Sequence, residues 1–130
     1  MSNEDWEKAE KMLSVPFGSV KMKIDGYNVT FSCVPEKPLK YMIVVYIDGT
    51  FKIKWAIEDC DIRRRFCFKS KSSLLTAKQK KALKREKKAI REEVEKQMTI
   101  YTYSPCFNSF RVLKSQLIHN NESIELMEDI

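Results

Sequence analysis

The apolar residues of positions 20–33 alternate with polar residues on both sides of Asp25-Gly26. Such alternation is typical of half-buried strands, because successive side chains of a strand point to opposite faces. Glycine tolerates the positive φ of a type I′ turn, so Asp-Gly between two alternating runs predicts a β-hairpin. We therefore expect a turn at this dipeptide, with Tyr27, Val29 and Phe31 facing one core.

The same pattern recurs around Asp48-Gly49. Residues 39–47 predict a strand whose run MIVVYI is apolar on both faces, as in a central strand, and apolar residues then alternate with Lys and Ala over 51–57. We predict a second hairpin here and, with the first, a four-stranded antiparallel meander. The core-facing residues of its last strand would be Phe51, Ile53, Trp55 and Ile57.

Helical spacing of apolar residues marks both ends of the chain. Residues 2–13 predict a short amphipathic helix that buries Trp6, Ala9 and Leu13. Near the other end, Ser104-Pro105 resembles a helix start, and it is followed by apolar residues at helical spacing, namely Phe107, Phe110, Leu113, Leu117 and Ile118. Residues 99–103 are rich in β-formers and predict a fifth strand, and the apolar tail at 124–127 would pack on the body or pair at a sheet edge.

The middle of the chain is less regular. Residues 58–68 fit either a single helical turn or an irregular edge strand, and 70–75 predict a polar linker. Thr76 and Gln79 match a capping box, so we expect one helix from about 76 to 98. The predicted order is α-ββββ-α-β-α: one α+β domain over residues 1–130, with an antiparallel four- to five-stranded sheet and helices packed on it.

Positive charge is concentrated in this middle region. Residues 61–91 hold thirteen Lys or Arg against two acidic residues, whereas the whole chain of 130 residues carries +6. Clustered cations attract anionic surfaces, although a basic helix can also serve only as a solubilising surface. The candidate partner-binding residues are Arg63, Arg64, Arg65, Lys80, Lys81, Lys84, Arg85, Lys87, Lys88 and Arg91.

The order of charges within the predicted helix favours a binding role. Its first half is basic and its second half holds Glu92, Glu93 and Glu95, which is the reverse of what the helix dipole stabilises. Each unfavourable pair costs only about 0.3–0.5 kcal/mol. Several acting together indicate that the charge serves an anionic partner, either an acidic protein surface or nucleic acid.

Catalytic chemistry finds little support in the residues. The single histidine, His119, lies thirteen positions after Cys106, a separation of about 20 Å along a continuous helix, so the two cannot form a dyad. No zinc-ligand spacing and no glycine-rich phosphate loop is present in the sequence. We expect no enzyme, no cofactor and no metal site.

The aromatic residues and the cysteines have ordinary structural interpretations. The strand aromatics share the alternation of core residues, so we expect them in the core rather than as stacking platforms for bases. Cys60 and Cys67 flank the arginine triplet, which would depress a thiol pKa, but reduced structural thiols fit all four cysteines. The charged N-terminus lacks the apolar run of a signal peptide or membrane anchor, so we expect a cytoplasmic protein.

Three segments resemble small accessory proteins carried by phages and prophages. They are KIDGYNVT at 23–30, the arginine triplet with the lysine-rich helix that follows it, and SPCFNSF with LKSQLIHNNESIEL within 104–126. The resemblance implies an anti-CRISPR-like or other anti-defence inhibitor that binds a host protein or nucleoprotein complex with an acidic surface. Many such inhibitors are acidic mimics of DNA, and this basic chain departs from that pattern.

These observations predict a non-enzymatic phage-type inhibitor that uses its basic helix as an electrostatic face in the cytoplasm of a host cell. The alternative is a small nucleic-acid-binding accessory or regulatory protein. Neither interpretation involves a membrane, and the sequence predicts no particular oligomeric state.

Overall fold

The computed structural model describes residues 1–127, and these form two compact units. Unit 1 comprises Met1–Phe68 together with the chain from Tyr103 onward, and unit 2 comprises Lys69–Thr102. Both helices and antiparallel strands are present, so the α+β class is confirmed. Within residues 1–127, no helix combines the length and apolar character needed to cross a bilayer.

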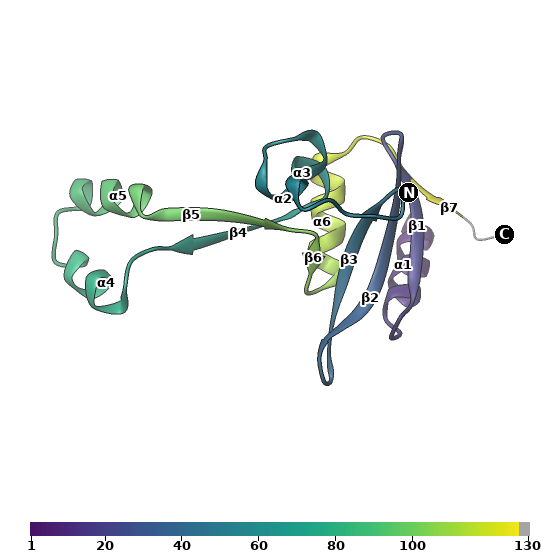
Figure 1. Cartoon of the computed structure of the whole chain (residues 1–130), viewed down its shortest axis with the longest axis horizontal. Coiled ribbons are helices and arrows are strands. Elements are labelled where there is room, and N and C mark those ends of the chain that lie inside the picture. The colour runs from purple at the N-terminus through teal and green to yellow at the C-terminus, as the bar shows by residue number, and fades with distance from the viewer. Residues whose placement is uncertain (128–130) are drawn as a thin grey trace. The chain divides into compact units, whose positions relative to one another are not determined.

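Unit 1 is built on a five-stranded antiparallel sheet with the strand order β6-β3-β2-β1-β7 (Figure 1). Three strands of the predicted four-stranded meander are present, and two short strands from later in the chain complete the edges of the sheet. They are β1 (Ser19–Ile24), β2 (Tyr27–Lys37), β3 (Lys40–Ile47), β6 (Cys106–Phe107) and β7 (Ile124–Met127). The apolar tail therefore pairs at an edge, beside β1.

Both Asp-Gly dipeptides are turns, as predicted. Asp25 and Gly26 have φ values of 46° and 88°, and Asp48 and Gly49 have 52° and 82°. Positive φ at both central residues is the signature of a type I′ turn. The strands that flank Asp25-Gly26 pair in register from Ser19 opposite Ser32 to Ile24 opposite Tyr27.

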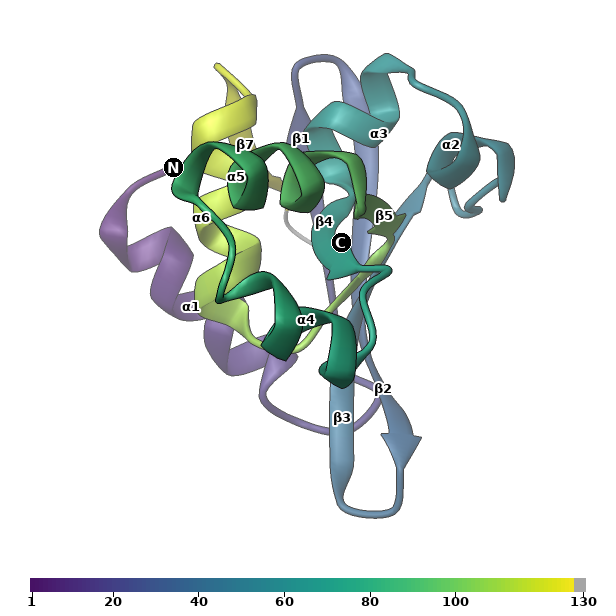
Figure 2. The same cartoon turned by 90° about the vertical axis from the view of Figure 1, so that its left-hand side faces the viewer.

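One face of the sheet carries the core. Alternate residues of β1, β2 and β3 are buried there beneath α1 (Asn3–Leu13) and α6 (Phe110–Asn120), which lie on the same side of the sheet in Figure 2. The two helices contact each other through Trp6 and Phe110, whose ring centroids are 6.2 Å apart. Trp6, Ala9 and Leu13 are buried as the helical spacing predicted.

The predicted fourth strand is wrong. After the turn at Asp48-Gly49 the chain pairs only through the bridge between Ile47 and Thr50, and it then forms the helical turn α2 (Lys54–Ile57). The place beside β3 is taken by β6, and the Val45 amide donates to the Pro105 carbonyl over 2.9 Å. Ile53 and Ile57 are consequently exposed, and Phe51 and Trp55 pack edge to face, with Trp55 at the margin of the core.

Of the remaining segments, one adopts a stated alternative and two differ from expectation. Residues 58–68 adopt the helical alternative as α3 (Asp61–Phe66), which buries Phe66. The last helix begins at Phe110 rather than at Ser104-Pro105, because the Ser109 hydroxyl caps it by accepting from the Val112 amide at 3.3 Å. Residues 106–107 belong to the sheet instead.

Unit 2 contains two helices and most of a two-stranded ribbon (Figure 1). The ribbon pairs β4 (Phe68–Ser73) with β5 (Thr99–Ser104), so the predicted polar linker is mostly a strand and the predicted fifth strand does not join the main sheet. The predicted continuous helix is also wrong. It is divided into α4 (Ala77–Leu83) and α5 (Lys88–Gln97), although the capping box at Thr76 is confirmed.

The Asp25 carboxylate ties the first hairpin to the C-terminal segment. It accepts from the backbone amides of Glu122 at 2.9 Å and Ser123 at 2.7 Å, and it also bonds the Arg65 guanidinium. These contacts, led by the Glu122 amide, hold the pKa of Asp25 below its usual value. The charged form of Asp25 therefore stabilises the fold.

Asp25→Asn is expected to lower the midpoint of thermal unfolding at neutral pH. Asparagine still tolerates the positive φ but lacks the charge that the two amides and Arg65 recognise. Because the folded-state pKa is depressed, this stabilisation is fully present above the unfolded-state pKa of about 4 and disappears as pH falls through the folded-state pKa. The difference between the wild type and the variant should thus shrink below pH 4.

Asp48→Asn is the matched control, since Asp48 occupies the equivalent position of the other Asp-Gly turn. It should leave the midpoint unchanged across the same pH range. Equal effects of the two substitutions would show that the turn, and not the carboxylate network, accounts for the stability.

Candidate partner-binding surface

Unit 2 is strongly basic for its size. Its 34 residues hold eleven Lys or Arg and four Glu, a net +7, which exceeds the +6 of the whole chain. The cations project from both of its helices and from the ribbon, and nearly all are exposed. A surface of this kind attracts anions over about 8–10 Å at physiological salt.

The chain turns between α4 and α5 without glycine or proline. Arg85 and Glu86 donate their amides to carbonyls three residues earlier, as at a tightened helix end, and Lys87 is extended. In a continuous helix Lys84 and Lys88 would face each other at i,i+4 and repel. The turn removes this contact and lets Leu83 become buried within unit 2, at 9% exposure.

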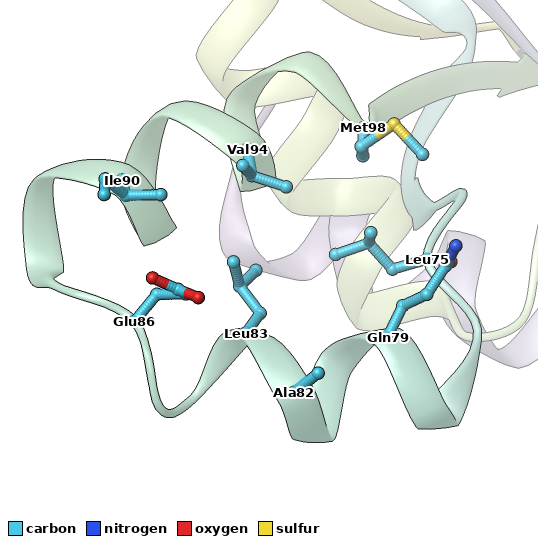
Figure 3. A pocket seen from close by; sticks show the side chains of 8 residues that line it. All are labelled: Leu75, Gln79, Ala82, Leu83, Glu86, Ile90, Val94 and Met98. Carbon is cyan, nitrogen blue, oxygen red and sulfur yellow. The ribbon is translucent and has the colours of Figure 1, made fainter.

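An apolar groove of about 540 Å³ lies between the two helices. In Figure 3 the side chains of α5 point toward those of α4 across the opening. We call this feature the apolar groove; its lining residues are Leu75, Gln79, Ala82, Leu83, Glu86, Ile90, Val94 and Met98. Ile90 remains 49% exposed, and Val94 and Met98 are partly exposed, so the groove is open to water.

A second hollow, of about 290 Å³, adjoins the apolar groove and shares Leu75 and Leu83 with it. We call it the cationic cleft because four of its nine lining residues are basic: Lys71, Lys80, Lys84 and Arg91. Glu95 is the single acid among the lining residues. One face of unit 2 thus offers both cations and apolar surface within the reach of a single ligand.

The arginine triplet lies in unit 1, where its side chains make intramolecular contacts. Arg63 stacks over Tyr103, 3.5 Å from the ring centroid, and Arg64 bonds Asp59 through two contacts of 2.9 Å. Arg65 bonds Asp61 at 2.8 Å and Asn121 at 3.1 Å in addition to Asp25. These contacts give the triplet a structural role, and its participation in partner binding stays a prediction.

The other predicted residues all belong to unit 2: Lys80, Lys81, Lys84, Arg85, Lys87, Lys88 and Arg91. Lys80, Lys84 and Arg91 meet in the cationic cleft, whereas Lys88 approaches Glu92 at 3.9 Å. Lys71, in the segment predicted as a polar linker, also lines the cationic cleft and was not among the candidate residues. The apolar residues Ile90, Val94 and Met98, which were not among the candidates, form one wall of the apolar groove.

The four cysteines differ in how far they are buried. All four thiols are free, and burial raises the pKa of Cys67 to about 11, the opposite of what the neighbouring arginines suggested. No group of three potential metal ligands occurs in the part of the chain that the structure describes.

We expect a thiol reagent at pH 8 to modify Cys60 and Cys106 and to spare Cys33 and Cys67 in the folded protein. The first two are partly exposed and the other two are buried, and at a pKa of about 11 roughly one Cys67 thiol in a thousand is ionised. Mass spectrometry of the labelled chain would locate the modified residues. Rapid labelling of Cys67 without unfolding would contradict its burial.

Because all four thiols are free, adding a reductant should leave the midpoint of thermal unfolding unchanged.

Comparison with known proteins yields no family model, no curated protein and no solved structure that matches this chain.

Proposed function

We propose that the protein is a non-enzymatic binding protein that holds an acidic surface of a protein partner with unit 2. The observation that carries this proposal is the adjacency of the cationic cleft and the apolar groove, which share Leu75 and Leu83. Cations steer an acidic partner and fix its register, while buried apolar contacts hold it in place. A nucleic-acid backbone would bind the cations of the cleft, but it has no aliphatic side chain that could occupy the apolar groove.

The wider role we propose is that of a phage-type inhibitor, anti-CRISPR-like, which binds a host defence protein or nucleoprotein complex in the host cytoplasm. Its support is the resemblance of the three sequence segments to phage accessory proteins, together with the basic charge of unit 2. Because that charge is positive, the inhibitor would engage an acidic face instead of imitating nucleic acid.

The ribbon of unit 2 favours a second candidate, nucleic-acid binding. The Lys69 ammonium lies 4.3 Å from the ring centroid of Tyr101, and this ring is 50% exposed on β5. An exposed aromatic ring beside lysines suits base stacking with backbone contact, and a two-stranded ribbon fits the major groove of DNA. Binding of this kind would depend on the ribbon and not on the apolar groove.

Affinity capture with the tagged full chain, with and without nuclease, separates the two candidates. The proposed function expects a protein partner that survives nuclease treatment and is lost with Lys71→Glu/Lys80→Glu/Lys84→Glu, which reverses three cations of the cationic cleft. The matched control is Lys8→Glu/Lys37→Glu/Lys54→Glu, which makes the same charge change at exposed positions of unit 1. Capture that disappears with nuclease would favour nucleic-acid binding.

A further inference from the structure

The apolar groove has the architecture of a helix-binding site. Ile90, Val94 and Met98 follow one another at i,i+4 along α5 and its C-cap. Gln79, Leu83 and Glu86, at i, i+4 and i+7, line the side formed by α4 (Figure 3). Each wall is therefore a row of side chains that runs along a helix, as in grooves that receive an amphipathic helix. The volume of about 540 Å³ accommodates several aliphatic side chains at once.

The charge of unit 2 restricts what can occupy the groove. A second copy of this chain would bring another net +7 against the first, so self-association through this face is opposed by repulsion. An acidic occupant gains instead, because the two hollows together are lined by four cations, Lys71, Lys80, Lys84 and Arg91, and by two acids, Glu86 and Glu95. Charge complementarity therefore selects a partner that is apolar on one side and acidic on the other.

We propose that the apolar groove receives one acidic amphipathic α-helix of a protein partner. Apolar side chains of that helix, spaced at i, i+3 or i+4, and i+7, fill the space between α4 and α5, and its carboxylates meet the cations of the cationic cleft. This inference rests on the proposed function. It specifies in addition that the partner's bound segment is helical and that the apolar groove of unit 2 holds it.

The test uses two fluorescent peptides of about 18 residues, or five helical turns. One places Leu on a single helical face and Glu on the opposite face, and the other has the same composition in scrambled order. We expect the amphipathic peptide to bind the wild-type chain at least about tenfold more tightly than the scrambled one, because only the first buries its leucines together. Fluorescence anisotropy measures both affinities.

Ala82→Trp is expected to weaken binding of the amphipathic peptide by about tenfold or more, since the indole fills the groove that the leucines require. Ala77→Trp places the same ring on α4 outside the lining residues and should change the affinity less than about twofold. Methyl NMR of the wild-type chain gives a readout without substitution: the amphipathic peptide should shift the resonances of Ile90, Val94 and Met98.

Equal affinity for the two peptides, or equal effects of the two tryptophan variants, would overturn the helix-in-groove proposal. If both peptides bind equally and Lys71→Glu/Lys80→Glu/Lys84→Glu abolishes both, the acidic-partner function stands and only the groove assignment fails. Sedimentation that shows a wild-type dimer and an Ala82→Trp monomer would identify a second copy as the occupant and would likewise overturn the proposal.

Discussion

Phe31→Ala is expected to lower the free energy of unfolding by about 3–5 kcal/mol, the usual cost of removing a buried phenyl ring. Phe31 is 0% exposed on β2, the middle strand of the sheet, where it pairs with Val20 on one side and Val45 on the other. Alanine would leave a cavity among residues that α1 and α6 hold in place. Urea unfolding followed by tryptophan fluorescence measures the loss.

Phe17→Ala is the matched control because Phe17 is 74% exposed. Its removal should change the free energy of unfolding by about 0.5 kcal/mol or less, as surface substitutions do. A cost below about 1 kcal/mol for Phe31→Ala would contradict the position of this ring at the centre of the core.

The sequence predicted the first hairpin and α1 because their signals are local. An Asp-Gly turn fixes the register of its own strands, and helical spacing identifies the face that α1 buries. The fourth strand failed because its place in the sheet depends on a distant segment. Cys106–Phe107 pairs with β3 and occupies the edge that residues 51–57 would have needed. The sequence around residues 51–57 contains no signal that a distant segment takes this edge.

The consequence for individual residues is clearest at Trp55. The alternating pattern predicts a buried core ring there, but Trp55 is only partly buried and packs against Phe51 at the margin of the core. Ile53, predicted on the same face, is 75% exposed. Long-range pairing thus overrode a strong local pattern, as is common for β-structure.

The candidate surface was predictable in its charge but not in its shape. The density of lysine and arginine is visible in the sequence, and nearly all of these side chains in residues 76–98 are exposed. The apolar groove exists because the chain reverses between α4 and α5, and no glycine or proline marks that reversal. Leu75 lies outside both helices, ahead of the capping box, and contributes to both hollows.

Lys71→Glu/Lys80→Glu/Lys84→Glu is expected to weaken binding of the captured partner by more than about a hundredfold, because like charges across an interface cost several kcal/mol. The fold should be unaffected, since all three side chains are exposed. Circular dichroism and the unfolding midpoint verify that point. Lys8→Glu/Lys37→Glu/Lys54→Glu should retain wild-type affinity. That result would show that the location of the cations in the cleft determines binding, and not the net charge of the chain alone.

The salt dependence of the wild-type affinity then identifies the kind of partner. Contact with six phosphates of a DNA duplex gives a log–log slope of about −5, because each contact releases condensed counterions. A protein partner anchored in the apolar groove should show a much shallower slope, expressed chiefly in the association rate. Full affinity of the cleft triple variant for the captured partner would refute the electrostatic surface, and a slope near −5 would assign unit 2 to nucleic acid instead.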